Sequence, residues 1–342
     1  MTDISRRDFL KNLGAGAVGL ALWGRSSATD LLLSPELGRI TRESLSVYAE
    51  PNDTSTILFQ HYRDDILHVY EEVTSPDGPG YNPIWYRVWG GYVHSSFVQK
   101  VKYQLNTLID EFPSQGQLME LTVPYSDAYR HRANEDWEKF YRLYYSSTHW
   151  VFSAKEGPDG LPWYEIRDGL VDLSYYVPVE HLRPVSAAEL TPIHADVSPG
   201  LKRIEISIDF QKLMAYEGDQ LVREVKVSTG LPYLSSAPNT IPTDTPRGNF
   251  KIHAKRPSVH MGDGTLRSDA EAYELPGVPW VSYFESSTGV AIHGTFWHNN
   301  FGMTMSHGCI NTPSEEAKWI YRWTTIPDDG NSENYRTPVL VY

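Results

Sequence analysis

Apolar and polar side chains alternate along several short stretches of the chain. In residues 203–210, Ile204, Ile206 and Ile208 alternate with charged or hydroxyl-bearing side chains. This period of two predicts a half-buried β-strand, because successive side chains of a strand point to opposite faces. Residues 222–227 follow a Glu-Gly-Asp turn and are expected to pair with this strand as a hairpin.

Two further strands are predicted near a His-Gly pair. Residues 280–284 are rich in aromatic and β-branched side chains, and residues 289–293 form a neighbouring strand that ends at His293. Residues 228–249, rich in Ser, Thr, Pro and Gly, predict a long loop, and residues 255–279 predict a second one. Long loops in a compact domain are often lids or cleft walls.

One short helix is expected near the C-terminal end. Residues 312–315 read Thr-Pro-Ser-Glu, a capping box with proline at the first helical position. The helix should run to about Thr325 and bury Ala317, Ile320, Tyr321 and Thr324. Such a helix would hold the residues before it on a rigid element.

A pattern of strands recurs earlier in the chain. Residues 85–98 contain a Trp-Tyr strand, a turn, a Tyr-Val strand and a short helix, and residues 163–182 repeat this order. The pattern resembles the bacterial SH3-like barrel. It predicts one such module at residues 40–102 and a second at residues 117–186. The modules could bind the cell wall or a peptide, or serve as a spacer that shapes the site.

Composition supports packed, β-rich domains. Apolar residues make up 40% of the 342 residues and aromatic ones 13%, which argues against disorder. The net charge of −13 argues against general nucleic-acid binding, and no basic stripe is visible. The scattered histidines and the absence of a zinc-type cysteine pattern predict no metal site.

The N-terminus has the pattern of an export signal. Residues 5–11 read Ser-Arg-Arg-Asp-Phe-Leu-Lys, a twin-arginine signature, and a mildly apolar stretch and a small-residue cleavage site follow. Residues 1–28 are therefore expected to be a signal peptide that directs the protein to the periplasm or to the cell wall and extracellular space. A retained anchor is the alternative.

The only cysteine, Cys309, lies in the sequence Ser306-His307-Gly308-Cys309-Ile310-Asn311. A lone cysteine is either an apolar filler or a nucleophile. Its short neighbours suit an exposed turn, and His293-Gly294 lies sixteen residues upstream. Together these features favour a nucleophile.

This motif resembles that of the L,D-transpeptidases of the YkuD type. The resemblance covers about residues 201–342 and includes Thr245-Pro246-Arg247-Gly248, which resembles the Thr-Pro-x-Gly turn of that family. It implies a β-sandwich-like catalytic domain with a short helix after the cysteine. The predicted fold class is therefore mainly β, with two small barrels before this domain.

The resemblance also implies roles for the residues of the motif. Because a free thiol is only a few per cent ionised at neutral pH, a histidine must take its proton. His293 is assigned that role and should leave a thiolate–imidazolium pair, with His307 as the competing candidate. The backbone carbonyl of Gly294 would orient His293.

The turn itself would hold the negative charge that develops on the substrate oxygen. The backbone N–H groups of His307, Gly308 and Cys309 are the expected donors. Ser306 and Asn311 would support the turn. The expected walls and carboxylate contacts of the substrate cleft are Tyr283, Trp297 and Arg247, with His298 as a further carboxylate candidate.

These residues predict an exported cysteine L,D-transpeptidase that acts on peptidoglycan stem peptides without a metal or cofactor. With water as the acceptor, the same thiol would make an L,D-carboxypeptidase. A cysteine endopeptidase of the cell wall is a second alternative, although its nucleophile usually precedes its histidine. A wall-binding protein with an inactive catalytic domain is a third.

Overall fold

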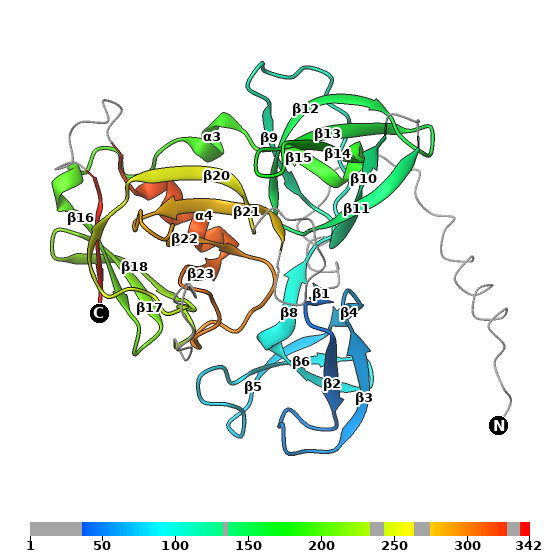
Figure 1. The fold of residues 1–342 in the computed structure, drawn as a ribbon. Helices are drawn as coiled ribbons and strands as arrows, with labels where there is room; N and C mark the ends of the chain where they lie inside the picture. Colours follow the sequence, from blue (N-terminus) through cyan, green and yellow to red (C-terminus); the bar gives the residue numbers. More distant parts are fainter. Residues whose placement is uncertain (1–35, 133–135, 233–242, 263–273, 327–335) are drawn as a thin grey trace, which may run out of the picture. The chain divides into compact units, whose positions relative to one another are not determined.

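The computed structural model describes residues 36–132, 136–232, 243–262, 274–326 and 336–342. The predicted signal at residues 1–28 lies outside them, as do parts of both predicted loops. Strands dominate the described residues, and the longest helix follows the cysteine motif (Figure 1). The predicted fold class, mainly β with a short helix after the cysteine, is therefore confirmed.

The first module, residues 36–101, contains two sheets with the strand orders β3-β2-β7-β6-β5 and β4-β1-β8. Its elements are β1 (Glu36–Ile40), β2 (Ser44–Tyr48), β3 (Ile57–Tyr62), β4 (Ile66–Val69), β5 (Glu71–Thr74), β6 (Ile84–Val88), β7 (Gly91–His94), the 3-10 turn η1 (Ser95–Phe97) and β8 (Val98–Val101). Ile40, Val47 and Val93 lie in its own buried core.

The second module, residues 117–184, is one seven-stranded sheet with the order β11-β10-β14-β13-β12-β9-β15. Its elements are β9 (Gln117–Leu121), β10 (Tyr125–His131), β11 (Trp137–Tyr144), β12 (Thr148–Glu156), β13 (Pro162–Asp168), β14 (Leu173–Pro178), η2 (Val179–His181) and β15 (Leu182–Pro184). The order β13-β14-η2-β15 repeats β6-β7-η1-β8, so the predicted repeat of elements is confirmed. That each module is an SH3-like barrel stays a prediction.

The C-terminal domain, residues 202–341, has two sheets with the orders β18-β17-β16-β24-β19 and β20-β21-β22-β23. Its elements are β16 (Lys202–Ser207), β17 (Lys212–Glu217), β18 (Gln220–Lys226), β19 (Gly248–Lys251), β20 (Ala254–Met261), β21 (Leu275–Tyr283), β22 (Ala291–Thr295), β23 (Ile310–Pro313), α4 (Ser314–Trp323) and β24 (Pro338–Val341). Both sheets and α4 contribute side chains to one buried core, including Ile206, Ile292 and Ile320.

Two predicted local features of this domain were wrong. Much of the predicted loop 255–279 is strand, because β20 and the start of β21 occupy it. Its proline and glycine residues concealed the strand; Gly277 has φ +79° and Trp280 has φ +59°, so β21 is irregular there. The helix α4 has Pro313 at its N-cap without a side-chain cap, because the Thr312 hydroxyl donates to the Ile310 carbonyl instead.

The connection before this domain contains a short helix that the sequence reading missed. The helix α3 (Ala187–Leu190) is capped by a reciprocal pair of hydrogen bonds between Ser186 and Glu189. A 3-10 turn, η3 (Pro199–Leu201), then leads directly into β16. Residues 184–200, which connect the second module to this domain, are thus partly ordered by local caps.

Residues 36–342 belong to one unit, and polar contacts join its modules. The Arg39 guanidinium of the first module donates to the Phe296 carbonyl of the C-terminal domain at 2.8 Å. Asp168 of the second module pairs with His260 of β20 at 2.7 Å. The first of these contacts holds the backbone beside Trp297.

Candidate active site

The strands β22 and β23 bring the two halves of the cysteine motif together. They run parallel, with Ile292 opposite Ile310 and His293 opposite Asn311. The two isoleucines point into the main core. Because side chains alternate along a strand, His293 and Asn311 point to the opposite face, as does Cys309 immediately before β23. The sheet thus places the predicted nucleophile and base on one face.

His293 is held by its own backbone. Its side chain is 2% exposed, and its Nδ1–H donates to the Gly294 carbonyl oxygen at 3.0 Å. In a neutral imidazole this leaves Nε2 with the free lone pair. Burial lowers the pKa of His293 to about 4, although the hydrogen bond to Gly294 opposes this shift.

Cys309 is half-buried against apolar side chains. It packs in a cluster with Val278, Val281 and Ala291, to which Tyr283 and Trp297 also belong. Burial raises the pKa of its thiol to about 11, and a backbone hydrogen bond with Ala291 opposes the rise only in part.

These two pKa values set the resting charge of the site. At pH 7, a thiol with a pKa of about 11 is protonated and an imidazole with a pKa of about 4 is neutral. The direction of both pKa shifts favours a neutral thiol and a neutral imidazole at rest over the thiolate–imidazolium pair expected from the sequence. The proton has to move from Cys309 when the thiol attacks.

Side-chain hydrogen bonds shape the turn before Cys309. The Ser306 hydroxyl donates to the Cys309 carbonyl at 2.5 Å and accepts from the Gly308 N–H at 3.2 Å. Gly308 has φ +116°, a backbone conformation that favours glycine. The support predicted for Ser306 thus has a direct geometric basis.

The same hydrogen bond changes the predicted oxyanion hole. Because the Gly308 N–H is already directed to Ser306, it is not left to bind a substrate oxygen in this conformation. The backbone N–H groups of His307 and Cys309 remain as candidates, and the His307 side chain is exposed.

Thr245 takes part in this turn, a role that was not predicted from the sequence. Its hydroxyl donates to the Gly308 carbonyl at 2.8 Å and accepts from the Gly230 N–H at 2.8 Å. Thr245 is 4% exposed. The Thr-Pro-x-Gly sequence was the signal that could have revealed it.

Asn311 has a buried partner. Its side-chain amide is hydrogen-bonded to His298 Nε2 at 2.8 Å, and His298 Nδ1 accepts from the Asn300 N–H. Burial, followed by the proximity of His293, lowers the pKa of His298 to about 3. His298 is therefore neutral and 3% exposed, which does not fit the predicted contact with a substrate carboxylate.

The predicted cleft residues are only partly gathered around Cys309. Tyr283 and Trp297 share its apolar cluster, and the rings of Trp297 and His293 have centroids 5.7 Å apart. Arg247 instead forms a surface ion pair with Asp209 at 3.0 Å. The catalytic and binding roles of all these residues stay predictions.

The described residues contain neither a metal-binding cluster nor a membrane-spanning helix. No group of three His, Cys, Asp or Glu side chains there could hold a metal ion. No helix in the same residues is long and apolar enough to cross a membrane.

The comparisons with known proteins identify the C-terminal domain. Residues 201–341 match the family model of the YkuD L,D-transpeptidase catalytic domain. This part of the chain is therefore an L,D-transpeptidase catalytic domain of the YkuD family. The match is to the domain, and the two modules before it lie outside the matched residues.

The individual proteins that match the chain have low sequence identity to it. A curated protein of Bacillus licheniformis, provisionally named as the L,D-transpeptidase YkuD, is 28% identical over 117 residues. The match covers 34% of this chain and 55% of that protein, so the chain spans about half the length of its curated relative.

Two solved structures match part of the chain. An L,D-transpeptidase from Mycobacterium smegmatis is 22% identical with a TM-score of 0.33, over 50% of this chain and 73% of that one. The catalytic domain of the E. faecium L,D-transpeptidase is 26% identical with a TM-score of 0.30, over 41% of this chain and 96% of that one.

Proposed function

We propose that this protein is an exported cysteine L,D-transpeptidase that remodels peptidoglycan stem peptides through an acyl-thioester on Cys309. The observation that carries the proposal is the pairing of β22 with β23, which places Cys309 and His293 on one face of the sheet. The family of residues 201–341 supports the same reaction class. The chemistry requires no metal or cofactor.

The proposed reaction begins with proton transfer. Nε2 of His293 takes the proton of the Cys309 thiol as the sulfur attacks the carbonyl before the terminal D-residue of a tetrapeptide stem. The peptide C–N bond breaks, and His293 returns the proton to the departing amine of D-alanine. An amine of a second stem then attacks the thioester and restores the thiol.

The resting neutral pair suits this sequence of steps. A low pKa leaves the imidazole unprotonated and able to act as a base at pH 7. The backbone N–H groups of His307 and Cys309 are placed on the turn beside the sulfur and would bind the oxyanion. Tyr283 and Trp297 would form an apolar wall for the stem.

The acyl acceptor separates the closest alternatives. If water resolves the thioester, the product is a shortened stem and the enzyme is an L,D-carboxypeptidase. If an amine resolves it, the product is a cross-link. Mass spectrometry of the products from a stem tetrapeptide, with and without an added acceptor amine, distinguishes the two. Cleavage of internal peptide bonds would indicate the endopeptidase.

The nucleophile is tested with a carbapenem, whose strained carbonyl acylates an activated thiol. Intact-protein mass spectrometry of the full chain should show one stable adduct on the wild type and none on Cys309→Ala. His293→Gln should slow adduct formation by about 10²-fold or more. An adduct on Cys309→Ala, or none on folded wild type, would overturn the assignment.

The proposal also includes the export of the protein and its contacts with the cell wall. The twin-arginine motif at residues 5–11 supports export to the periplasm or the cell-wall space. Replacement of Arg6 and Arg7 by lysine should retain the protein in the cytoplasm, as measured by cell fractionation. The two modules are proposed to contact the wall, and peptidoglycan is the proposed partner.

A further inference from the structure

The two modules contain the same tyrosine–tryptophan pair. In the first module, the rings of Tyr48 and Trp85 meet edge to face with centroids 5.5 Å apart. In the second module, Tyr129 and Trp163 meet edge to face at the same distance. The repeated elements therefore provide an internal comparison, in which any difference around the tryptophan is specific to one module.

The indole nitrogens differ in their partners. Trp163 Nε1–H donates to the Asp159 carboxylate at 2.8 Å. Trp85 is fully buried, and its Nε1 has no hydrogen-bond partner among the described residues. A buried donor without an acceptor is uncommon in folded proteins. The first module thus lacks an acceptor that the second supplies.

An insertion in the preceding turn explains the difference. Both turns contain Pro-Asp-Gly, and a backbone hydrogen bond closes each one. In the second module the Gly157 N–H donates to the Leu161 carbonyl, and in the first the Ser75 N–H donates to the Pro83 carbonyl. The first turn is longer by the four residues 79–82. These residues displace Asp77 from the position of its counterpart.

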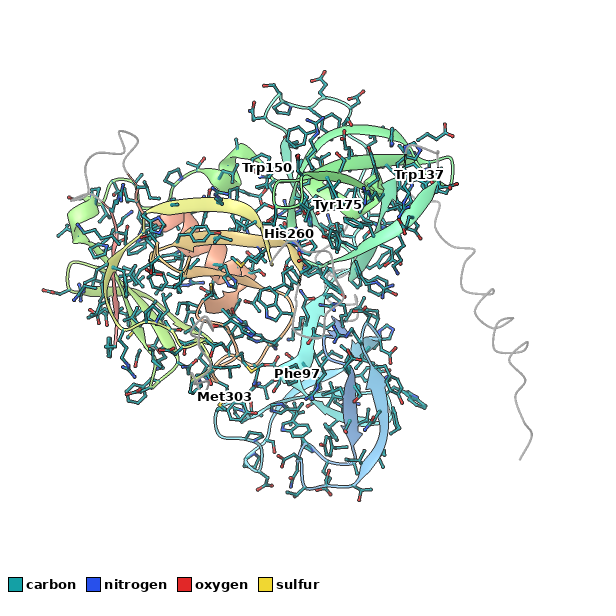
Figure 2. All side chains as sticks on the ribbon, viewed as in Figure 1. Phe97, Trp137, Trp150, Tyr175, His260 and Met303 are labelled. Atoms are coloured by element: carbon teal, nitrogen blue, oxygen red, sulfur yellow. The ribbon has the colours of Figure 1, made fainter. Side chains whose placement is uncertain are left out.

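The insertion also forms one wall of a pocket. A cavity of about 330 Å³ is lined by Tyr81 of the insertion together with Tyr48, Trp85 and Phe97. Phe97, labelled in Figure 2, comes from η1 between β7 and β8. In the second module, Trp137 packs beside Trp163 with ring centroids 6.0 Å apart.

Two opposite charges lie at this pocket without ionic partners. Arg42 stacks on Phe97 at 4.5 Å, and Asp53 also lines the cavity. Both side chains are exposed, and neither has a hydrogen bond or ion pair from its side chain to another described residue. The pocket therefore offers aromatic walls, one cation and one anion.

The histidine at the pocket is neutral. His94 Nε2 lies 2.8 Å from the Asn82 carbonyl oxygen, and its Nδ1 is hydrogen-bonded to the Ser96 hydroxyl. Burial lowers the pKa of His94. Because a carbonyl only accepts, Nε2 carries the proton and Nδ1 accepts from Ser96. The charge at the pocket is thus set by Arg42 and Asp53.

We propose that this pocket of the first module binds a peptidoglycan stem peptide, separately from the catalytic cleft. A stem carboxylate pairs with Arg42, a stem amine pairs with Asp53, and a peptide carbonyl accepts from Trp85 Nε1. Gly78 lies against this indole nitrogen, so the peptide displaces the glycine turn to reach it. The choice of stem peptide rests on the proposed function.

The chemistry of the pocket favours a peptide over a glycan. A neutral sugar chain could stack on the aromatic rings, but it would leave Arg42 and Asp53 unpaired. A short peptide with a free carboxylate, a free amine and backbone carbonyls satisfies all three polar groups. Occupation by glycan alone is therefore an outcome that counts against the proposal.

Tryptophan indole resonances can test the proposal directly. The full chain, carrying Cys309→Ala to prevent turnover, is labelled with ¹⁵N at the indole nitrogens and titrated with a soluble stem tetrapeptide. Trp85→Phe, Trp163→Phe and Trp297→Phe assign the three resonances that are followed. The Trp85 resonance should shift saturably, whereas that of Trp163, already hydrogen-bonded, should not move. A Trp85 resonance that is unchanged at saturating peptide overturns the proposal.

Matched arginine variants test the charged contact. Arg42→Gln should raise the apparent Kd read at Trp85 at least about five-fold, because it removes the carboxylate partner. Arg167→Gln is the control, since Arg167 stacks on Phe152 of the second module at 4.3 Å in the same way. An equal Kd for both variants would contradict the assigned contact, and circular dichroism verifies that each is folded.

The two proposals can fail independently. A shift confined to the resonance of Trp297, with Trp85 unchanged, means that the peptide occupies only the catalytic cleft. In that case this inference fails while the proposed function stands. If the Trp85 resonance shifts saturably but the wild-type protein converts no stem peptide, this inference stands and the proposed function fails. A shift with a glycan chain that lacks peptide would reassign the pocket.

Discussion

The hydroxyl group of Thr245 donates a hydrogen bond of 2.8 Å to the carbonyl oxygen of Gly308, immediately before Cys309. The hydroxyl oxygen of Thr245 also accepts from the Gly230 N–H, so one side chain joins two segments that are far apart in sequence. The Ser306 hydroxyl stabilises the same turn by donating to the Cys309 carbonyl and accepting from the Gly308 N–H. The position of the thiol thus depends on two hydroxyl groups from different loops.

Replacing Thr245 by valine should slow acylation of Cys309. Valine keeps the shape but removes both hydrogen bonds and leaves the buried Gly230 N–H unpaired, which costs about 1–3 kcal/mol. A misplaced turn should lower the rate constant for carbapenem acylation on the order of 10²-fold. Stopped-flow mass spectrometry measures the rate, and urea unfolding measures the stability.

Thr245→Ser is the matched control for this prediction. Serine keeps the hydroxyl and should restore most of the rate, because it can still donate to Gly308 and accept from Gly230. If serine were as slow as valine, keeping the hydroxyl would not restore the rate, and the hydrogen bonds alone would not position the turn.

If Cys309 and His293 are both neutral at rest, the Cys309 thiol should react slowly with alkylating reagents at neutral pH. With a Cys309 pKa of about 11, the thiolate fraction rises about ten-fold per pH unit between pH 7 and 9.5, and alkylation by iodoacetamide should rise in parallel. The measurement is the alkylation rate of the wild type by mass spectrometry. Rapid alkylation at pH 6 that does not change with pH would instead reveal a stable thiolate–imidazolium pair.

Local patterns in the sequence predicted much of this site. The alternation in residues 289–293 predicted the strand that carries His293, and the Ser-His-Gly-Cys run predicted the turn before Cys309. Neither pattern depends on distant residues. The contact of His293 with the Gly294 carbonyl, which the family resemblance implied, is also present.

The features that were missed depend on contacts between distant segments. Thr245 and Gly308 are 63 residues apart, and no local pattern reveals their hydrogen bond. The strand β24 pairs parallel with β16, from the opposite end of the domain. The start of β21, residues 275–279, was concealed by Pro276 and Gly277, whose local preferences are overridden by pairing with β20.

Arg39 should connect the first module to the catalytic cleft. Its guanidinium is 2% exposed, donates to the Phe296 carbonyl at 2.8 Å and pairs with Asp64 at 2.9 Å. Arg39→Gln should lower the free energy of unfolding by about 1–3 kcal/mol, because buried polar partners lose their donor. It should also slow acylation, since Phe296 precedes Trp297.

Urea unfolding and the acylation rate are the measurements for Arg39→Gln. Arg63→Gln provides the control, because Arg63 forms an exposed pair with Glu43 and should change stability by less than about 1 kcal/mol. Equal effects of the two substitutions would show that the contact with Phe296 has no structural role.

Lys255 of β20 makes stability depend on pH. Its Nζ donates to the carbonyls of Tyr321 and Thr324 at the C-terminal end of α4, both at 2.8 Å. Burial, with a smaller contribution from Lys202, lowers the pKa of Lys255 to about 8. In the unfolded chain its pKa is about 10.4, so the unfolded state binds more protons between these two values.

Stability should therefore increase as the pH rises above about 8. From this lysine alone, the free energy of unfolding should rise by about 2 kcal/mol between pH 7 and 9.5. Urea unfolding of the wild type should show this rise relative to Lys255→Met, whereas Lys251→Met, which changes an exposed lysine of β19, should follow the wild type. A wild-type curve parallel to that of Lys255→Met over this range would mean that the lysine titrates alike in both states, and that the α4 carbonyls fully compensate its burial.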